Sequence, residues 1–116
     1  MNQEFRRAPR RAVDAPVQVV DCMTGEVMGR LGNVSETGML LFSRGAGVEE
    51  GLFQVRFGLR LSGAQEHLFH VGVQQLWSEA HPASGNHWTG YRFIDIAPED
   101  LELLREYVTS GSARRR

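Results

Sequence analysis

The side chains best suited to binding an anion are gathered at the N-terminus of this sequence. Four arginines lie within six positions there: Arg6, Arg7, Arg10 and Arg11. Three more arginines end the chain, no lysine occurs, and the other six arginines face all 14 acidic residues. A guanidinium offers a planar fork of donors that matches phosphate and carboxylate oxygens. The cluster indicates an anionic partner, although a solvated basic tail explains the same residues.

A second candidate group is the six-residue stretch from Asn33 to Gly38. Asn33 and Ser35 can both hydrogen-bond the backbone of a turn, and Gly38 can adopt a positive φ before the next strand. The same amide and hydroxyl could instead face a ligand, with the missing side chain of Gly38 giving that ligand room. On this stretch alone, the structural and the ligand-binding interpretations both stay open.

Catalytic and metal-binding patterns find no support in the sequence. Cys22 has no histidine close to it in sequence that could activate the thiol. His67 and His70 are three apart on a predicted strand, so they face opposite sides and cannot share a metal ion. His81 and His87 flank a loop that supplies no further ligands. We therefore expect neither an enzyme nor a metal site.

The bulk properties describe one globular domain. The chain has 116 residues, of which 41% are hydrophobic and 23% charged, and a chain of this length builds a single core. It contains no apolar run of the roughly 18 residues that a membrane helix needs. A single cysteine cannot build a disulfide framework. These features predict a cytoplasmic protein without membrane insertion.

Most of the chain has the period-two pattern of β-strands. The clearest example is residues 52–61, where Phe53, Val55 and Phe57 alternate with polar or small residues. One buried and one wet face is typical of an antiparallel sheet. The predicted strands cover residues 13–21, 26–31, 38–43, 52–61, 66–77 and 87–96. We expect Trp77 and Trp88 to pack against apolar neighbours, with base stacking by Trp77 as a lesser alternative.

The end of the chain changes to helical spacing. Pro98 and the two acids after it suit a first helical turn, and Leu101, Leu104 and Val108 recur on one face. Gly111 is a plausible stop, so we expect about three turns of helix. Several short antiparallel strands with one terminal helix predict an all-β fold, a small barrel or strongly curved sheet that the helix covers.

Taken together and in this order, the two candidate groups resemble the signature of the PilZ family, Arg-x-x-x-Arg followed by Asp/Asn-x-Ser-x-x-Gly. Arg6 and Arg10 supply the first part, while Asn33, Ser35 and Gly38 supply the second. The pair Arg7 and Arg11 has the same spacing but shifts the match of the following strand by one residue. Residues 90–95 and 96–100 are similar to the last strand of the family and to its entry into the closing helix. The resemblance spans roughly residues 4–108.

This resemblance implies a six-stranded antiparallel β-barrel with a C-terminal α-helix, and a receptor for cyclic di-GMP. The residues that it assigns to the ligand are Arg6, Arg7, Arg10, Asn33, Ser35 and Gly38. Arginines would bind phosphate or guanine, the Asn33 amide would contact guanine, Ser35 would donate to an oxygen and Gly38 would give clearance. The implied organisation is a flexible arm over residues 1–12, the barrel and helix over 13–110, and a disordered basic tail over 111–116.

The expected mechanism is ordering of the arm around the ligand, with the signal passed to an unidentified effector protein that controls motility, pili, biofilm or virulence. Asn33 in place of the commoner Asp and Phe5 in place of an additional arginine leave affinity and stoichiometry open. One alternative is a PilZ-like adaptor that binds proteins but no nucleotide. A barrel that binds single-stranded nucleic acid is disfavoured. Such barrels expose aromatic side chains on a sheet face, whereas the aromatic residues of the predicted strands fall mainly on apolar faces. Apart from cyclic di-GMP, we expect no cofactor.

Overall fold

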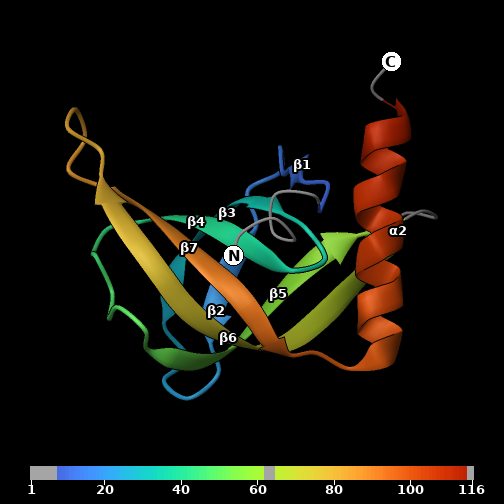
Figure 1. The fold of residues 1–116 in the computed structure, drawn as a ribbon, viewed down its shortest axis with the longest axis horizontal. Coiled ribbons are helices and arrows are strands. Elements are labelled where there is room, and N and C mark those ends of the chain that lie inside the picture. The colour runs from blue at the N-terminus through green and yellow to red at the C-terminus, as the bar shows by residue number, and fades with distance from the viewer. Residues whose placement is uncertain (1–7, 62–64, 115–116) are drawn as a thin grey trace.

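The computed structural model of the protein describes residues 8–61 and 65–114. Within these ranges, strands fill most of the chain and one helix ends it (Figure 1). The elements are β1 (Arg11–Ala12), β2 (Gln18–Asp21), β3 (Val27–Val34), β4 (Gly38–Ser43), β5 (Leu52–Arg60), β6 (Glu66–Ala80), β7 (His87–Asp95) and α2 (Pro98–Arg114). No helix in this described part is long and apolar enough to cross a membrane.

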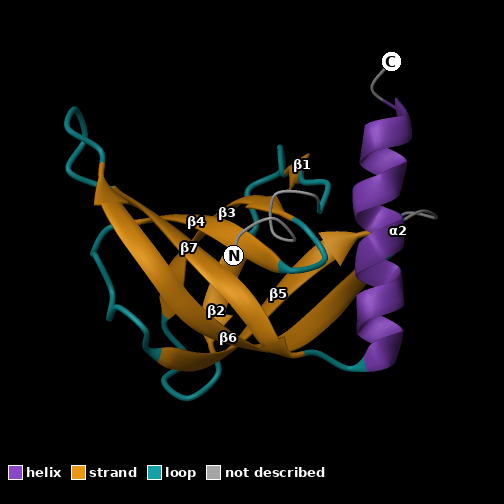
Figure 2. Ribbon diagram, viewed as in Figure 1, coloured by secondary structure: helices purple, strands orange, loops and turns teal. Residues whose placement is uncertain are grey.

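The strands close into a barrel. Their order is β1-β3-β2-β5-β6-β7-β4, and β4 pairs back onto β3, so that six strands form a ring and β1 extends it beside β3. Every pairing is antiparallel. Figure 2 shows the curved strands with α2 standing beside the end of the barrel. This arrangement confirms the predicted six-stranded antiparallel barrel with a C-terminal helix.

The barrel interior is filled by the alternating residues of the two longest neighbouring strands. Phe57 of β5 lies opposite Phe69 of β6, and their rings stack at 5.4 Å between centroids. Val55 and Val71 form another opposed pair, and all four side chains are almost fully buried. Cross-strand pairs of this kind are the unit of sheet stabilisation. The predicted buried face of residues 52–61 is therefore confirmed.

The first predicted strand is wrong in its extent, because residues 13–21 do not form one strand. Residues 13–17 separate β1 from β2. Pro16 lies in this break, and a proline has no backbone N–H with which to continue a ladder. The next strand, β3, is longer than expected and runs to Val34, so Asn33 belongs to a strand and pairs with Ala12 of β1.

The strand β6 carries a bulge that changes the predicted position of Trp77. Its pairing with β7 shifts register between Gln75 and Trp77. An extra residue in one strand reverses the faces of all the residues after it. Trp77 therefore leaves the face of Val71 and Val73, and 41% of its surface is exposed. The expectation that Trp77 shares their buried face is wrong for this reason.

Helix α2 is longer than predicted, since it continues through Gly111 to Arg114 and contains 17 residues. At 1.5 Å per residue its length is about 25 Å. Leu104, Tyr107 and Val108 form its buried face and join the core of the barrel. The predicted stop at Gly111 and the disordered tail over 111–114 are therefore replaced by helix, and residues 115–116 lie outside the described residues.

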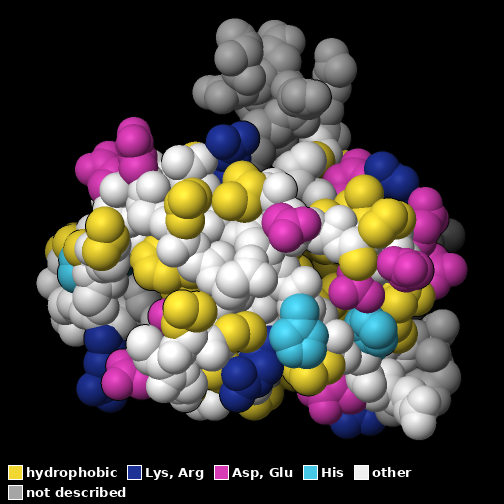
Figure 3. Space-filling model, turned by 90° about the horizontal axis from the view of Figure 1, so that it is seen from below, with side chains coloured by type: hydrophobic (Ala, Val, Ile, Leu, Met, Phe, Trp, Pro, Cys, Tyr) yellow, Lys and Arg dark blue, Asp and Glu magenta, His cyan; other side chains and the backbone are white. Residues whose placement is uncertain are grey.

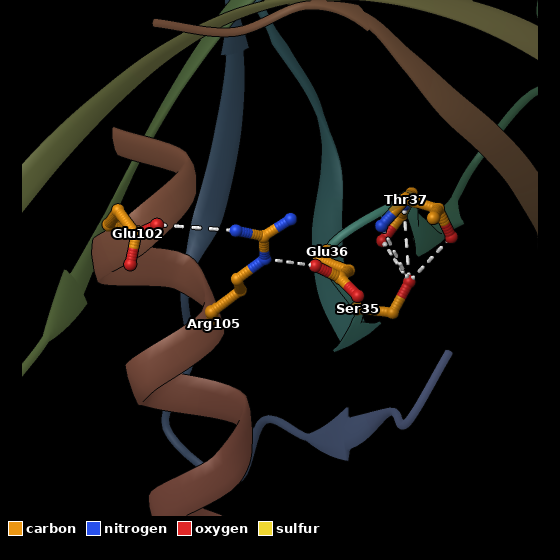
Figure 4. Close-up of polar contacts among 6 residues, drawn as sticks. Ser35, Glu36, Thr37, Glu102 and Arg105 are labelled. Carbon is orange, nitrogen blue, oxygen red and sulfur yellow. Dashed lines mark hydrogen bonds and ion pairs between the residues drawn. The ribbon is translucent and has the colours of Figure 1, made fainter. Parts of the chain in front are cut away.

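Two arginine contacts fasten α2 to the barrel. Arg11 of β1 donates a hydrogen bond from Nη1 to the Tyr107 carbonyl at 2.8 Å, and its guanidinium lies 3.9 Å from the centre of the Tyr107 ring. From the helix, Arg105 pairs with Glu36 in the turn between β3 and β4 and with Glu102 one turn earlier (Figure 4). The helix is thus tied both to β1 and to the turn.

The outer surface mixes side chains of all types. Seen from below in Figure 3, hydrophobic side chains are scattered between acidic, basic and histidine side chains. Large apolar side chains that are half exposed or more include Met23, Val48 and Leu52. Single exposed apolar residues are normal on soluble proteins. Exposed apolar side chains alone therefore do not mark a binding surface on this protein.

The strand β4 approaches β7 so closely that Gly38 has no space for a side chain. A Cβ at Gly38 would lie 2.2 Å from the carbonyl oxygen of Tyr91 and 3.2 Å from the Cα of Arg92. Both atoms belong to the backbone of a central strand, which cannot rotate away as a side chain can. Gly38 therefore sets how near the two strands lie.

For the contact between β1 and the helix, we expect Arg11→Ala to lower the free energy of unfolding by about 1–2 kcal/mol, because a charge-assisted hydrogen bond and a cation–π contact are lost together. Urea denaturation followed by circular dichroism measures this change. The matched control is Arg105→Ala, which removes an exposed ion pair and should cost less. Equal losses of unfolding free energy in the two variants would contradict a larger contribution of Arg11 to stability.

For the contact between β4 and β7, we expect Gly38→Ala to destabilise the protein by about 3 kcal/mol, at the upper end of overpacking effects, because the added methyl meets fixed backbone. The control is Gly45→Ala, where a Cβ would meet nothing within 4 Å, and where a change of about 0.5 kcal/mol or less is expected. Thermal denaturation of both variants provides the test, and a Gly38→Ala protein as stable as the control would refute the close approach.

Candidate functional site

The turn between β3 and β4 is held together by Ser35. The Ser35 side chain is fully buried, and its Oγ accepts hydrogen bonds from the backbone N–H groups of Thr37 and Gly38 at 3.1 and 3.2 Å. The Thr37 hydroxyl lies 3.0 Å from the same oxygen (Figure 4). These contacts are those of the structural interpretation, in which Ser35 shapes the backbone of the turn. Donation by Ser35 to a ligand stays a prediction.

Gly38 also has a structural task that differs from the expected one. Its backbone does not have a positive φ; the described glycines that do are Gly25, Gly47 and Gly85. The contact that requires glycine is the approach to the Tyr91 carbonyl described above. The expectation of a left-handed turn residue is therefore wrong, and the missing side chain serves strand packing.

Arg10 and Asn33 meet at the start of this turn. Arg10 donates a hydrogen bond from Nη1 to Asn33 Oδ1 at 2.6 Å. Burial lowers the pKa of the Arg10 guanidinium, but an arginine remains charged in a protein. A positive charge that has already lost part of its water is well placed to attract an anion.

Part of the expected arm belongs to the described residues, which begin at Ala8. That the residues before about Ala12 are mobile without ligand stays a prediction. In the described part, Arg11 and Ala12 pair with β3, and the Arg10 side chain contacts Asn33. The predicted ligand residues Arg6 and Arg7 lie outside the described residues.

Neighbouring arginines of the N-terminal cluster point in opposite directions. Successive side chains of a strand face opposite sides, and here Arg10 reaches Asn33 while Arg11 reaches Tyr107 of α2. Of the two spacings that fit the sequence, the one that ends at Arg10 brings a guanidinium to the turn. The one that ends at Arg11 brings it to the helix.

A hollow of about 210 Å³ opens beside the contact between Arg10 and Asn33. Its wall on the far side is Trp77, whose indole lies across Gly90 of the neighbouring strand; a Cβ at Gly90 would be 2.5 Å from that ring. The hollow is lined by Arg10, Asn33, Met39, Leu40, Leu76, Trp77, Gly90 and Tyr91. Pockets for whole drug-sized ligands measure about 300–1,000 Å³. This hollow therefore fits part of such a ligand, such as one base.

Tyr91 also lines the hollow, and because it follows Gly90 in β7 its side chain faces the barrel interior. Its side chain is almost fully buried, and burial raises the pKa of the Tyr91 hydroxyl to about 12. The hydroxyl is thus neutral at physiological pH and donates to Gln75 Oε1 at 3.4 Å. The same Gln75 amide holds the loop after β4, through Val48 N–H and the Ala46 carbonyl. These hydrogen bonds link the interior side of β7 to the loop after β4.

Trp77 lines this hollow, although the sequence favours a packing role for it and gives base stacking only as the lesser alternative. The alternation of β6 places it on the buried face, and the bulge that turns it outward has no signature in the sequence. The available signal was Gly90 in the middle of the last strand, since a glycine beside an aromatic residue of the neighbouring strand often lets the ring lie over it. With Trp77 included, the site offers a guanidinium, an amide and an indole face, which suit a planar, polar-edged anion.

Solved structures with the same fold support this assignment of the architecture. The inhibitor of motility MotI/DgrA of Bacillus subtilis is 18% identical with a TM-score of 0.75, covering 96% of this chain and 52% of that one. The PilZ domain of Escherichia coli YcgR with c-di-GMP is 17% identical with a TM-score of 0.67, covering 96% and 94%. The longer YcgR in complex with c-di-GMP is 18% identical with a TM-score of 0.72, covering 93% and 46%.

The present chain thus spans about half the length of the MotI chain and of the longer YcgR chain. A search of curated proteins by sequence gives no match. The sequence does match the PilZ domain family over residues 4–110, which include the barrel, the turn and most of α2. The chain therefore belongs to the PilZ domain family.

Proposed function

We propose that this protein is a receptor for cyclic di-GMP that holds the nucleotide between Arg10, Asn33 and Trp77. The observation that carries the proposal is the partly buried guanidinium of Arg10, bound to Asn33 at the edge of a hollow walled by an indole. A cyclic dinucleotide has the anionic phosphates and planar bases that these three groups can recognise. The solved YcgR PilZ domain with c-di-GMP has the same fold.

Each side chain has a separate role in this proposal. Arg10 forks onto a phosphate or onto the O6/N7 edge of guanine, and the Asn33 amide contacts a base edge. Trp77 stacks on a guanine face, as aromatic side chains do with single bases. Ser35 and Gly38 act through the backbone, because they fix the turn that presents Asn33. Arg6 and Arg7 would add contacts from the N-terminal segment.

The proposed output is a change of surface that an effector protein reads. The liganded site joins the N-terminal segment to the turn, and the turn is already linked to α2 through Glu36 and Arg105. One structural relative is named as an inhibitor of motility, which supports motility or a related surface behaviour as the process controlled. The proposed activity is ligand binding, without catalysis.

The first test is calorimetric titration of the purified protein with cyclic di-GMP. We expect saturable binding, and Arg10→Ala should weaken it by tenfold to more than a hundredfold, since a hydrogen bond to a charged group is worth about 1.5–3 kcal/mol. Arg44→Ala is the control, because Arg44 lies outside the site, and it should bind as the parent does. Absence of binding by the parent protein would favour the adaptor without nucleotide.

The role of Trp77 has its own test. Trp77→Ala should weaken cyclic di-GMP binding by roughly 5-fold to more than 100-fold, because base stacking on an aromatic ring contributes about 1–3 kcal/mol. Trp77→Phe keeps an aromatic face and should recover most of the affinity. Circular dichroism checks that both variants fold. If the Trp77→Ala and Trp77→Phe variants bind the nucleotide equally well, Trp77 does not stack on a base.

A further inference from the structure

A second and larger hollow, of about 870 Å³, lies apart from the nucleotide site. Its lining comes from β2, β3, β4, the start of β6, Gly58 of β5 and Asn86 in the loop between β6 and β7. Because its lining crosses four strands of the barrel, this hollow is a groove. None of its lining residues belongs to the smaller hollow around Arg10.

The groove crosses the strands along one row of residues. Gln18 of β2 lies opposite Arg30 of β3, and Arg30 lies opposite Phe42 of β4. Strands lie about 4.8 Å apart, so the span from β5 across β2 and β3 to β4 is roughly 15 Å. An extended peptide advances about 3.3 Å per residue. The groove thus matches a segment of about five extended residues.

One end of the groove contains backbone groups without a strand partner. β2 pairs with β5 only at Val20–Arg56 and Asp21–Val55, and Cys22 donates to the carbonyl of Gln54. Backbone groups of a strand alternate in direction, so the N–H and C=O of Gly58, four residues after Gln54, also point toward the side of β2. Within the described residues, no strand pairs with Gly58 on that side. A bound segment can hydrogen-bond there.

The opposite end of the groove is basic. The guanidinium of Arg30 lies 5.5 Å from the centre of the Phe42 ring. The exposed Arg44 directly follows β4, the strand that contains Phe42. The acid among the lining residues is Glu66, which lies at the other end beside Gly58, where a Cβ would be 2.1 Å from its carboxylate. Partly buried apolar side chains, including Val17 and Met28, lie between the two ends.

We propose that this groove binds an extended segment of a partner protein, with acidic residues against Arg30 and Arg44, apolar residues in the middle, and a backbone anchor at Gly58. The charge arrangement selects the chemistry of the partner: two positive charges meet the acids, while Glu66 favours a basic residue at the far end. The segment docks on the outer face away from Arg10 and Trp77. Effector binding and nucleotide binding therefore use different surfaces.

Synthetic six-residue peptides provide the test. The first peptide has the sequence Glu-Glu-Leu-Thr-Val-Lys. The second has the same residues in reverse order, because the groove does not fix the direction of the bound chain. Titration of ¹⁵N-labelled protein should shift the amides of Gly29, Arg30, Gly45 and Gly58 for at least one peptide. A peptide with lysines in place of the glutamates should bind at least fivefold more weakly. Equal binding of the lysine peptide, or no shift with any, would overturn the proposal.

Protein variants separate the two ends of the groove. The double variant Arg30→Glu with Arg44→Glu should lose at least tenfold in peptide affinity, whereas Arg92→Glu, outside the groove, should lose little. Gly58→Pro removes the anchoring N–H and should weaken binding several-fold more than Gly58→Ala, which keeps it. An unchanged affinity in the double glutamate variant refutes the basic end even if Gly58→Pro fails to fold. All folded variants should keep the parent affinity for cyclic di-GMP.

Discussion

The approach of Gly38 to the backbone of Tyr91 is the contact on which the site depends. It brings β4 against β7, and this pairing completes the ring of strands together with that of β3 and β4. On the outer face of the same junction, Trp77 lies across Gly90. Asn33 of β3 and Trp77 of β6 are separated in the ring by β4 and β7. The pairing of β4 with β7 therefore brings both residues to the same hollow.

Helix α2 and the candidate site are held by the same elements. Arg11 contacts Tyr107 of the helix, while Arg10 contacts Asn33. Glu36 joins the turn between β3 and β4 to Arg105 of the helix. One link joins the helix to β1 through Arg11, and the other joins it to the turn between β3 and β4 through Glu36. The helix therefore contacts the elements that border the candidate site, although none of its described side chains lines the hollow beside Trp77.

The barrel could be predicted because its signals are local. Alternation in residues 52–61 reflects one buried face, and the spacing of Leu104 and Val108 reflects a helix face. The position of Trp77 could not be predicted, because a bulge depends on how β6 pairs with β7 and leaves no fixed pattern in either strand. For Ser35 and Gly38, the residue types indicated a turn, but burial and the approach of Tyr91, which decide what each does, are tertiary contacts.

The pairing of β1 with β3 consists of two residue pairs, Arg11–Val34 and Ala12–Asn33. Such a short ladder is prone to slip, and a slip by one residue exchanges the faces of every side chain in the strand. A slip in one direction would bring Arg11 to the place of Arg10 beside Asn33 and Ala12 to the helix, whereas a slip in the other would bring Arg10 to the helix and Pro9 to Asn33. Either slip leaves a guanidinium at only one of the two places, so the two arginine contacts together hold this short strand in its register.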